Sequence, residues 1–193
     1  MTEMNRLTHM FLTVAVILSM SSCMKEKREA TYTAQEEKID KYITSNMYKN
    51  VGTGTEAKTD TLRVEYNGGA SRLVTEEGIG EELKADGTVS FYYAGYSFNG
   101  SKSYTNLFAT NHKETADAAQ WSLTDADYEL MTVDLADSGL IQGLKDGLLG
   151  VKSRESCQIL FSGKYGFGKK SFGIIPAESA LMFEIWVVAV SNE

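Results

Sequence analysis

Hydrophobic and polar residues alternate along five short segments of this chain, as they do in strands that bury one face. In the last of these segments, Phe183 shares a face with the apolar residues two positions away, and Glu184 lies on the opposite face. The pattern predicts a sheet-rich domain. The predicted strands are residues 61–66, 88–96, 128–135, 156–161 and 181–187.

Helical spacing appears in two places. Ile141, Leu144 and Leu148 recur at i, i+3 and i+7, which predicts a short helix over residues 141–149. Gly143 and Gly147 would let this helix approach the sheet closely, and Gly150 is placed as its C′ residue. A second helix is expected over about residues 34–46, after a charged tether at 25–32, because Thr33 and Glu36 fit a capping box.

Residues 101–127 are the least regular part of the chain, with a short helical turn expected at 116–119. Loops of this length inside a domain usually carry a function or an embedded element. Farther along, a glycine-rich loop leads into the last strand through Pro176, the only proline, which predicts a fixed φ at that entry.

The first residues are typical of an export signal. Arg6 precedes an apolar run at 10–20, which is too short to span a membrane, and Cys23 follows where the run ends. This arrangement resembles a bacterial lipoprotein signal, which implies cleavage before Cys23, lipidation of that residue, and a membrane partner reached through the lipid anchor. The alternative is an ordinary secretory signal cut near Ser22, with Cys23 incidental.

Composition narrows the function further. The balance of 19 Lys and Arg against 26 Asp and Glu gives a net charge of −7, which argues against nucleic acid as a partner. Beyond the leader there is one histidine, His112, which is expected in a solvated loop, so no metal site or cofactor is expected. Cys157 lies in an alternating apolar run and is expected to be a buried structural thiol.

Three motifs then occur in order. The sequence GLIQGLKDGL at 139–148 resembles the VIxGWxxGL signature of FKBP-type peptidyl-prolyl cis-trans isomerases. Tyr165-Gly166, the GIIP at 173–176 and the LMFEI at 181–185 resemble the end of that family's domain, and 86–95 resembles its GDxVxVHYTG strand. The order of leader, acidic helix and domain also resembles envelope lipoproteins of Bacteroidetes.

The resemblance implies an α+β fold, in which a curved antiparallel sheet wraps around one short helix. It divides the chain into a signal peptide at 1–22, a tether and N-terminal helix at 23–59, and an FKBP-like domain at 60–193 with an insert at about 101–127. The protein would then lie in the bacterial cell envelope, anchored by lipid to the outer membrane on its periplasmic or surface face.

The family's reaction is rotation about X-Pro bonds in proline-containing protein segments, which requires no nucleophile, metal or cofactor. It requires an apolar cleft that binds the twisted amide better than the planar one. The resemblance implies that the Ile141 amide and the Tyr165 hydroxyl donate hydrogen bonds to the substrate. It assigns catalytic roles to Tyr93, Ile141, Tyr165 and Phe183, and substrate contacts to Met131, Leu140, Leu144, Ile174 and Ile175.

Departures from the family pattern leave two interpretations. Leu144 stands where many members have Trp, and Met131 where an aromatic residue is usual. The family's FDSS segment follows the turn at Gly100, and here Tyr104 or Thr105 would replace its pocket Asp. The chain is therefore either an isomerase with weak or altered activity, or a non-catalytic FKBP-like binding or chaperone module. For any single aromatic residue, a purely structural role in the core is a further alternative.

Overall fold

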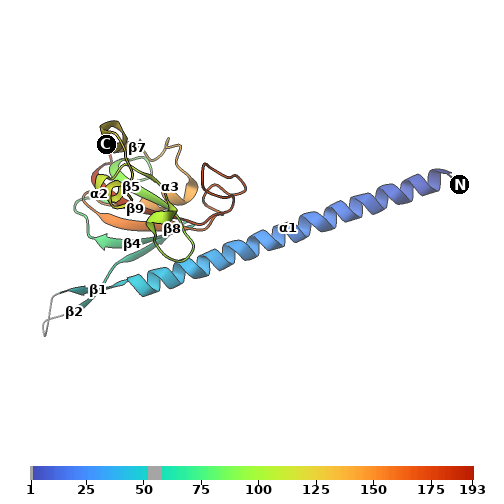
Figure 1. The fold of residues 1–193 in the computed structure, drawn as a ribbon, viewed down its shortest axis with the longest axis horizontal. Coiled ribbons are helices and arrows are strands. Elements are labelled where there is room, and N and C mark those ends of the chain that lie inside the picture. Colours follow the sequence, from blue (N-terminus) through green and yellow to red (C-terminus); the bar gives the residue numbers. More distant parts are fainter. Residues whose placement is uncertain (1, 52–57) are drawn as a thin grey trace.

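A computed structural model describes the backbone of residues 2–51 and 58–193 and the side chains of residues 24–48 and 60–193. Its centre is a curved seven-stranded antiparallel sheet with the order β3-β4-β8-β9-β5-β6, in which β7 also pairs with β5 (Figure 1). The register of β5 against β9 shifts between Ser90 and Phe91, and such a bulge bends a sheet. The strands are β3 Val64–Asn67, β4 Ala70–Glu76, β5 Thr88–Ser97, β6 Leu107–Thr110, β7 Met131–Asp134, β8 Ser156–Phe161 and β9 Leu181–Ser191.

The helix predicted at 141–149 is confirmed as α3, Gln142–Leu148, and lies inside the curve of the sheet. A Cβ atom on Gly143 would lie 2.2 Å from the Phe161 ring, and one on Gly147 would lie 2.1 Å from Ile159. Both positions therefore need glycine for the close approach to β8. Gly150 has a φ of +83°, as expected for the residue that ends a helix.

The N-terminal helix is much longer than the sequence predicted. α1 runs from Thr2 to Asn46 without a break, so the predicted start near residue 34 and the predicted tether at 25–32 are wrong. The residues from 24 to 33 include good helix formers and no glycine or proline, so nothing there ends the helix. Tyr48–Val51 (β1) and Lys58–Thr61 (β2) then form a separate two-stranded hairpin.

The side chains of the leader, Cys23 included, lie outside the described residues. In the part of the chain that the structure does describe, no helix is both long enough and apolar enough to cross a membrane.

The sheet is covered on both faces. One face of β9 places Leu181, Phe183 and Ile185 in the main core with α3, as predicted. The opposite face places Met182 in a second core with Ile39 and Ile43 of α1. This second core explains why α1 packs along the sheet in Figure 1 before it extends away from the domain.

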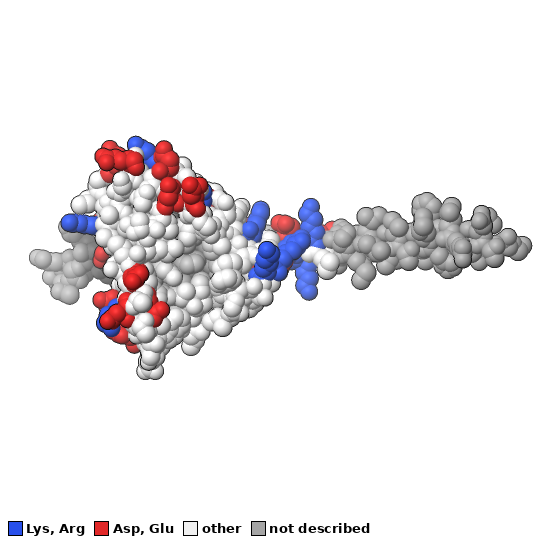
Figure 2. Space-filling view, turned by 90° about the horizontal axis from the view of Figure 1, so that it is seen from above, with Lys and Arg blue, Asp and Glu red and all other residues white. Residues whose placement is uncertain are grey.

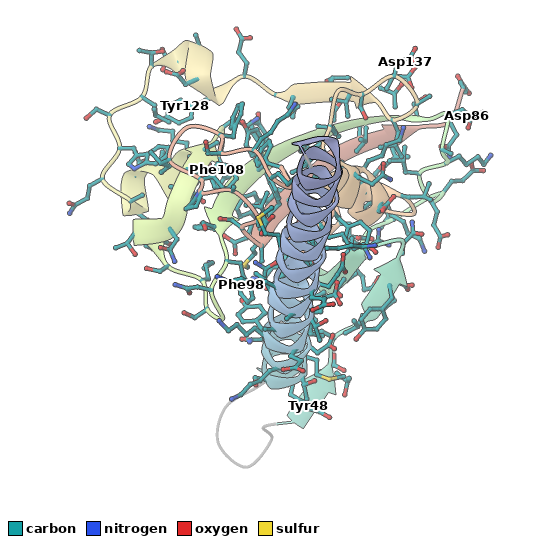
Figure 3. All side chains as sticks on the ribbon, turned by 90° about the vertical axis from the view of Figure 1, so that its right-hand side faces the viewer. Tyr48, Asp86, Phe98, Phe108, Tyr128 and Asp137 are labelled. Atoms are coloured by element: carbon teal, nitrogen blue, oxygen red, sulfur yellow. The ribbon has the colours of Figure 1, made fainter. Side chains whose placement is uncertain are left out.

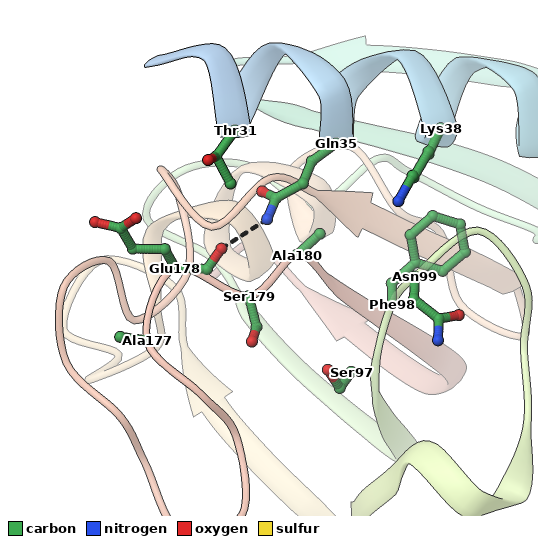
Figure 4. Close-up of a pocket in the computed structure, with 10 residues that line it drawn as sticks. All are labelled: Thr31, Gln35, Lys38, Ser97, Phe98, Asn99, Ala177, Glu178, Ser179 and Ala180. Carbon is green, nitrogen blue, oxygen red and sulfur yellow. Dashed lines mark hydrogen bonds between the residues drawn. The ribbon is translucent and has the colours of Figure 1, made fainter. Parts of the chain in front are cut away.

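One glutamine ties α1 to the loop before β9. The Gln35 side chain donates a hydrogen bond to the Glu178 carbonyl at 2.7 Å (Figure 4). It also accepts one from the Gly163 amide at 2.8 Å. Ser162 adds a hydrogen bond to Glu36 at 3.1 Å. The two ends of the loop at 163–178 are therefore both held by one turn of α1.

A buried ion pair lies next to the C-terminal end of α3. Glu155 is fully buried, and its Oε1 lies 3.4 Å from Nε of the buried Arg72. Arg72 also donates to the carbonyls of Gly147 and Leu149, which places a positive charge at the C-terminal end of α3. Cys157, nearby on β8, is a buried free thiol as predicted, and burial raises its pKa.

The region predicted as an insert at 101–127 is only partly one. Residues 107–110 form β6 of the main sheet, and the chain then continues through α2, Lys113–Ala118, and a 3₁₀ turn at Asp125–Tyr128.

His112 is not a solvated loop residue. Its side chain is half-buried and stacks on the Trp186 ring with centroids 3.7 Å apart, and burial lowers its pKa. Figure 3, seen along α1, shows Phe108 and Tyr128 to one side of this helix and Asp86 and Asp137 to the other.

Candidate functional site

An apolar cavity of about 330 Å³ lies on the inner face of the sheet, between β5, β7, the start of α3 and the loop before β9. This volume is at the lower end of what small-ligand sites usually have. No acidic or basic side chain lines it. The lining residues are Phe91, Tyr93, Phe108, Ala109, Met131, Gly139, Leu140, Ile141, Leu144, Phe167, Phe172 and Phe183.

Phe183 of β9 is the centre of the aromatic wall. Its ring lies edge-on to Phe108 with centroids 5.7 Å apart, and 6.5 Å from the Tyr93 ring. Behind it, the Phe161 ring stacks at 6.0 Å. These separations are those of favourable aromatic pairs, so the wall is held in shape by its own contacts. Burial raises the pKa of Tyr93, so its hydroxyl stays protonated and remains a donor at neutral pH.

The start of α3 supplies a backbone donor at the edge of this cavity. Ile141 is the N-cap residue, and its carbonyl accepts from the amides of Leu144 and Lys145. The Ile141 amide donates to no acceptor among the described residues. Leu144, one turn later, is buried and forms part of the floor. The first helical turn therefore offers one donor next to apolar surface, as helix N-termini generally do.

The structure brings six of the nine predicted site residues together around the cavity: Tyr93, Met131, Leu140, Ile141, Leu144 and Phe183. Tyr165 lies outside the cavity. Its ring packs against Gly69, where an added Cβ atom would lie 2.2 Å from the ring, and its carbonyl accepts a hydrogen bond from the Gly143 amide. The other two predicted residues, Ile174 and Ile175, point to different places because of the turn at Phe172–Ile175. Ile175 is buried in the core, and Ile174 is 75% exposed.

The segment predicted to replace the family's FDSS motif lies elsewhere. Tyr104 and Thr105 are exposed residues of a 3₁₀ turn, Tyr104–Asn106, and neither lines the cavity. Instead, Ala109 pairs with Gly95 of β5, and the Phe108 ring fills the space above that glycine. Phe108 and Ala109, rather than Tyr104 and Thr105, therefore line the cavity on this side, and neither brings a carboxylate into it.

Sequence reasoning missed a residue that positions the cavity wall. Asn111 is buried, accepts a hydrogen bond from the Tyr93 amide at 2.6 Å, and donates one to the Glu129 carbonyl at 2.9 Å. It thus ties β5 to the segment that leads into β7. No periodic pattern marks it. Phe167 and Phe172 were also missed, although two phenylalanines in an otherwise polar, glycine-rich loop were the available signal.

The arrangement suits a short apolar segment of an extended chain. The aromatic and aliphatic walls exclude water, and the Ile141 amide can hold one carbonyl oxygen of that segment. Among the described residues, no group of His, Cys, Asp or Glu side chains could hold a metal ion. The site therefore offers shape, apolar surface and two donors, the Ile141 amide and the Tyr93 hydroxyl.

Comparisons with known proteins agree with this geometry. Residues 80–188 match the family model described as FKBP-type peptidyl-prolyl cis-trans isomerase. FK506-binding protein 1 of Aspergillus oryzae is 22% identical over 123 residues, which cover 64% of this chain and 99% of that protein.

Solved structures share the fold at low sequence identity. FkpA from Escherichia coli has a TM-score of 0.55 at 19% identity, covering 99% of this chain and 73% of that one. A peptidyl-prolyl cis-trans isomerase from Pseudomonas syringae pv. tomato has a TM-score of 0.54 at 17% identity, covering 85% of this chain and 96% of that one.

Proposed function

Because the chain belongs to the FKBP-type peptidyl-prolyl cis-trans isomerase family, we propose that its cavity binds X-Pro segments of proteins and accelerates their cis–trans isomerisation. The observation that carries this proposal is an aromatic cavity with one donor at its edge, the Ile141 amide, which has no acceptor among the described residues. We further propose that the protein acts in the cell envelope, held by a lipid on Cys23.

The chemistry follows from the amide bond itself. Resonance opposes rotation with a barrier of about 18–20 kcal/mol. Twisting breaks the conjugation, so the transition state is less polar along its C–N bond and tolerates an apolar site better than the planar amide does. The walls around Phe183 supply that site, and the Ile141 amide holds a neighbouring carbonyl while the prolyl ring turns. Only binding that is stronger in the twisted state accelerates the reaction.

We propose that the activity is weak. Ala109 puts no charge into the cavity, and Leu144 offers less surface than the Trp that many family members have. Preorganised electrostatic groups usually contribute strongly to catalysis, and this lining has no charged one. The absence of an acidic side chain from this lining also favours a second function, a non-catalytic module that binds extended apolar segments.

A pair of matched variants tests the proposal. We expect the full chain to speed the cis-to-trans relaxation of a proline-containing tetrapeptide, and Ala109→Asp to raise kcat/KM by about tenfold, equal to about 1.4 kcal/mol of transition-state stabilisation. Thr105→Asp is the control, since it adds the same charge to an exposed turn outside the cavity. The control should leave the rate unchanged.

The outcomes separate the two functions. If neither the natural chain nor Ala109→Asp accelerates relaxation, the isomerase assignment is wrong. Binding of unfolded segments with or without proline would then support the module. If Thr105→Asp raises the rate and Ala109→Asp does not, the Asp position has been assigned to the wrong residue.

A further inference from the structure

Positive charge gathers where α1 leaves the domain. Figure 2 shows Lys and Arg side chains around this point, although the whole chain has a net charge of −7. We call this surface the neck. Its cations come from two segments far apart in the sequence: Lys25, Lys27 and Arg28 of α1, and Lys164, Lys169 and Lys170 of the loop before β9.

Contacts between the two segments place them side by side. Arg28 Nη1 lies 3.9 Å from Glu178 Oε1, and the Glu178 amide donates to the Gly168 carbonyl, next to Lys169 and Lys170. Burial raises the pKa of Tyr32 on α1, and Lys164 of the loop lies close enough to oppose part of this rise. Within residues 25–32 of α1 and 163–178 of the loop, these six cations outnumber the three acidic residues, Glu26, Glu29 and Glu178.

The same loop exposes apolar side chains. Phe172 is 62% exposed and Ile174 is 75% exposed, whereas most of the other large apolar residues that the structure describes are buried or partly buried. Phe172 also lines the cavity and stacks on Phe167 with ring centroids 4.7 Å apart, so its exposed ring lies at the rim of the cavity. Exposed aromatic and aliphatic residues among lysines are the composition of surfaces that bind at a lipid interface.

The neck also lies next to the proposed anchor. Arg28 is five residues after Cys23 in a continuous helix, which is about 7.5 Å along its axis. We propose that the neck, together with Phe172 and Ile174, docks on the surface of an anionic lipid bilayer and turns the rim of the cavity toward the membrane. This inference rests on the proposed lipid anchor at Cys23. Charge complementarity and the nearby anchor favour a bilayer over a protein partner.

Electrostatics sets the size of the expected effect. Each Lys or Arg near an anionic membrane surface shifts such an equilibrium by about fivefold, and the effect fades within a Debye length. Reversing Lys169 and Lys170 to Glu removes two cations and adds two anions. The ratio of docked to undocked protein should therefore fall by at least about 30-fold. Neither lysine lines the cavity.

The test uses the full chain reconstituted into vesicles that contain brominated lipids, which quench tryptophan fluorescence on contact. Ile174→Trp places a reporter at the exposed position, and its signal is taken as the difference from the natural chain, which has two tryptophans of its own. We expect quenching in vesicles with about a third phosphatidylglycerol and little quenching in pure phosphatidylcholine. Lys169→Glu/Lys170→Glu should abolish it.

Tyr66→Trp is the matched control, because Tyr66 is 68% exposed on β3 and belongs to neither segment of the neck. It should stay unquenched in both vesicles. Equal quenching of Trp at position 174 in both lipids, or none in either, overturns the proposal. A change in this tryptophan fluorescence that occurs only when a prolyl peptide is added would also overturn the proposal. Flotation with neutral vesicles reports the anchor separately, and tetrapeptide relaxation in solution reports the isomerase activity.

Discussion

α3 approaches β8 closely at Gly143, and Gly143→Ala tests whether the fold depends on this contact. The new Cβ would lie 2.2, 2.5 and 2.6 Å from three atoms of the Phe161 ring. Carbon atoms in contact are normally about 3.5–4.0 Å apart, so ring and helix must separate by roughly 1.3 Å. Phe161 is fully buried and stacks on Phe183, so the ring has no free space to enter.

The expected loss follows from two opposing effects. Overpacking a core costs about 1–3 kcal/mol, and the upper half of that range applies because the overlap exceeds an ångström. Replacing glycine by alanine inside a helix returns up to about 1 kcal/mol, and less in the first turn, where Gly143 lies. We therefore expect the free energy of unfolding to fall by about 2 kcal/mol.

Urea unfolding of the full chain measures this loss. With a slope near 2 kcal/mol per molar, the midpoint should move down by about 1 M while the slope stays constant. Gly139→Ala is the control, because a Cβ there meets nothing within 4 Å, and its free energy of unfolding should stay within about 0.5 kcal/mol of the natural chain. A Gly143→Ala midpoint equal to that of the control would refute the close packing of α3 on β8.

Two further predictions concern buried charge and pH. Arg72→Met should lower the free energy of unfolding by about 3 kcal/mol, because it leaves the buried Glu155 without one of its two arginine partners. In the same urea titration, the double variant Arg72→Met/Glu155→Met should have a free energy of unfolding closer to that of the natural chain. Burial lowers the pKa of His112 although Glu114 and Glu184 act against it, so the unfolded chain binds this proton more readily. The stability it contributes is present above its ordinary pKa of about 6.5 and is lost as pH falls below that value. Unfolding at about pH 7.5 and about pH 5.5 should show a smaller drop for His112→Gln, and equal drops would contradict this reasoning.

Local pattern was enough for the elements whose periodicity is strong. β8 begins and ends at the predicted residues, and β5 differs by one, because every second residue is apolar over most of each strand. The runs of three apolar residues at 159–161 and 181–183 break the alternation, and pattern alone could not show which element covers the second face of the sheet. The packing of α1 places Met182 and Leu160 in that second core.

The candidate site was harder to predict, because it depends on strand pairing and on turns. Choosing Phe108 over Tyr104 requires the register of β6 on β5, which two aromatic residues four positions apart do not decide locally. The consecutive isoleucines before Pro176 both suggested the pocket. A left-handed Gly173 and the turn around it instead send Ile175 into the core and Ile174 to the surface.

Gln35 connects α1 to the cavity although its two hydrogen-bond partners, Gly163 and Glu178, are not among the residues that line it. Its amide group holds Gly163 and Glu178, the two ends of the loop that carries Phe167 and Phe172, so this part of the cavity rim must move with the helix. A flexible tether would let the domain turn freely about its anchor. A continuous helix bonded to the rim does not, and the direction in which the cavity opens is therefore set relative to the N-terminal end of α1.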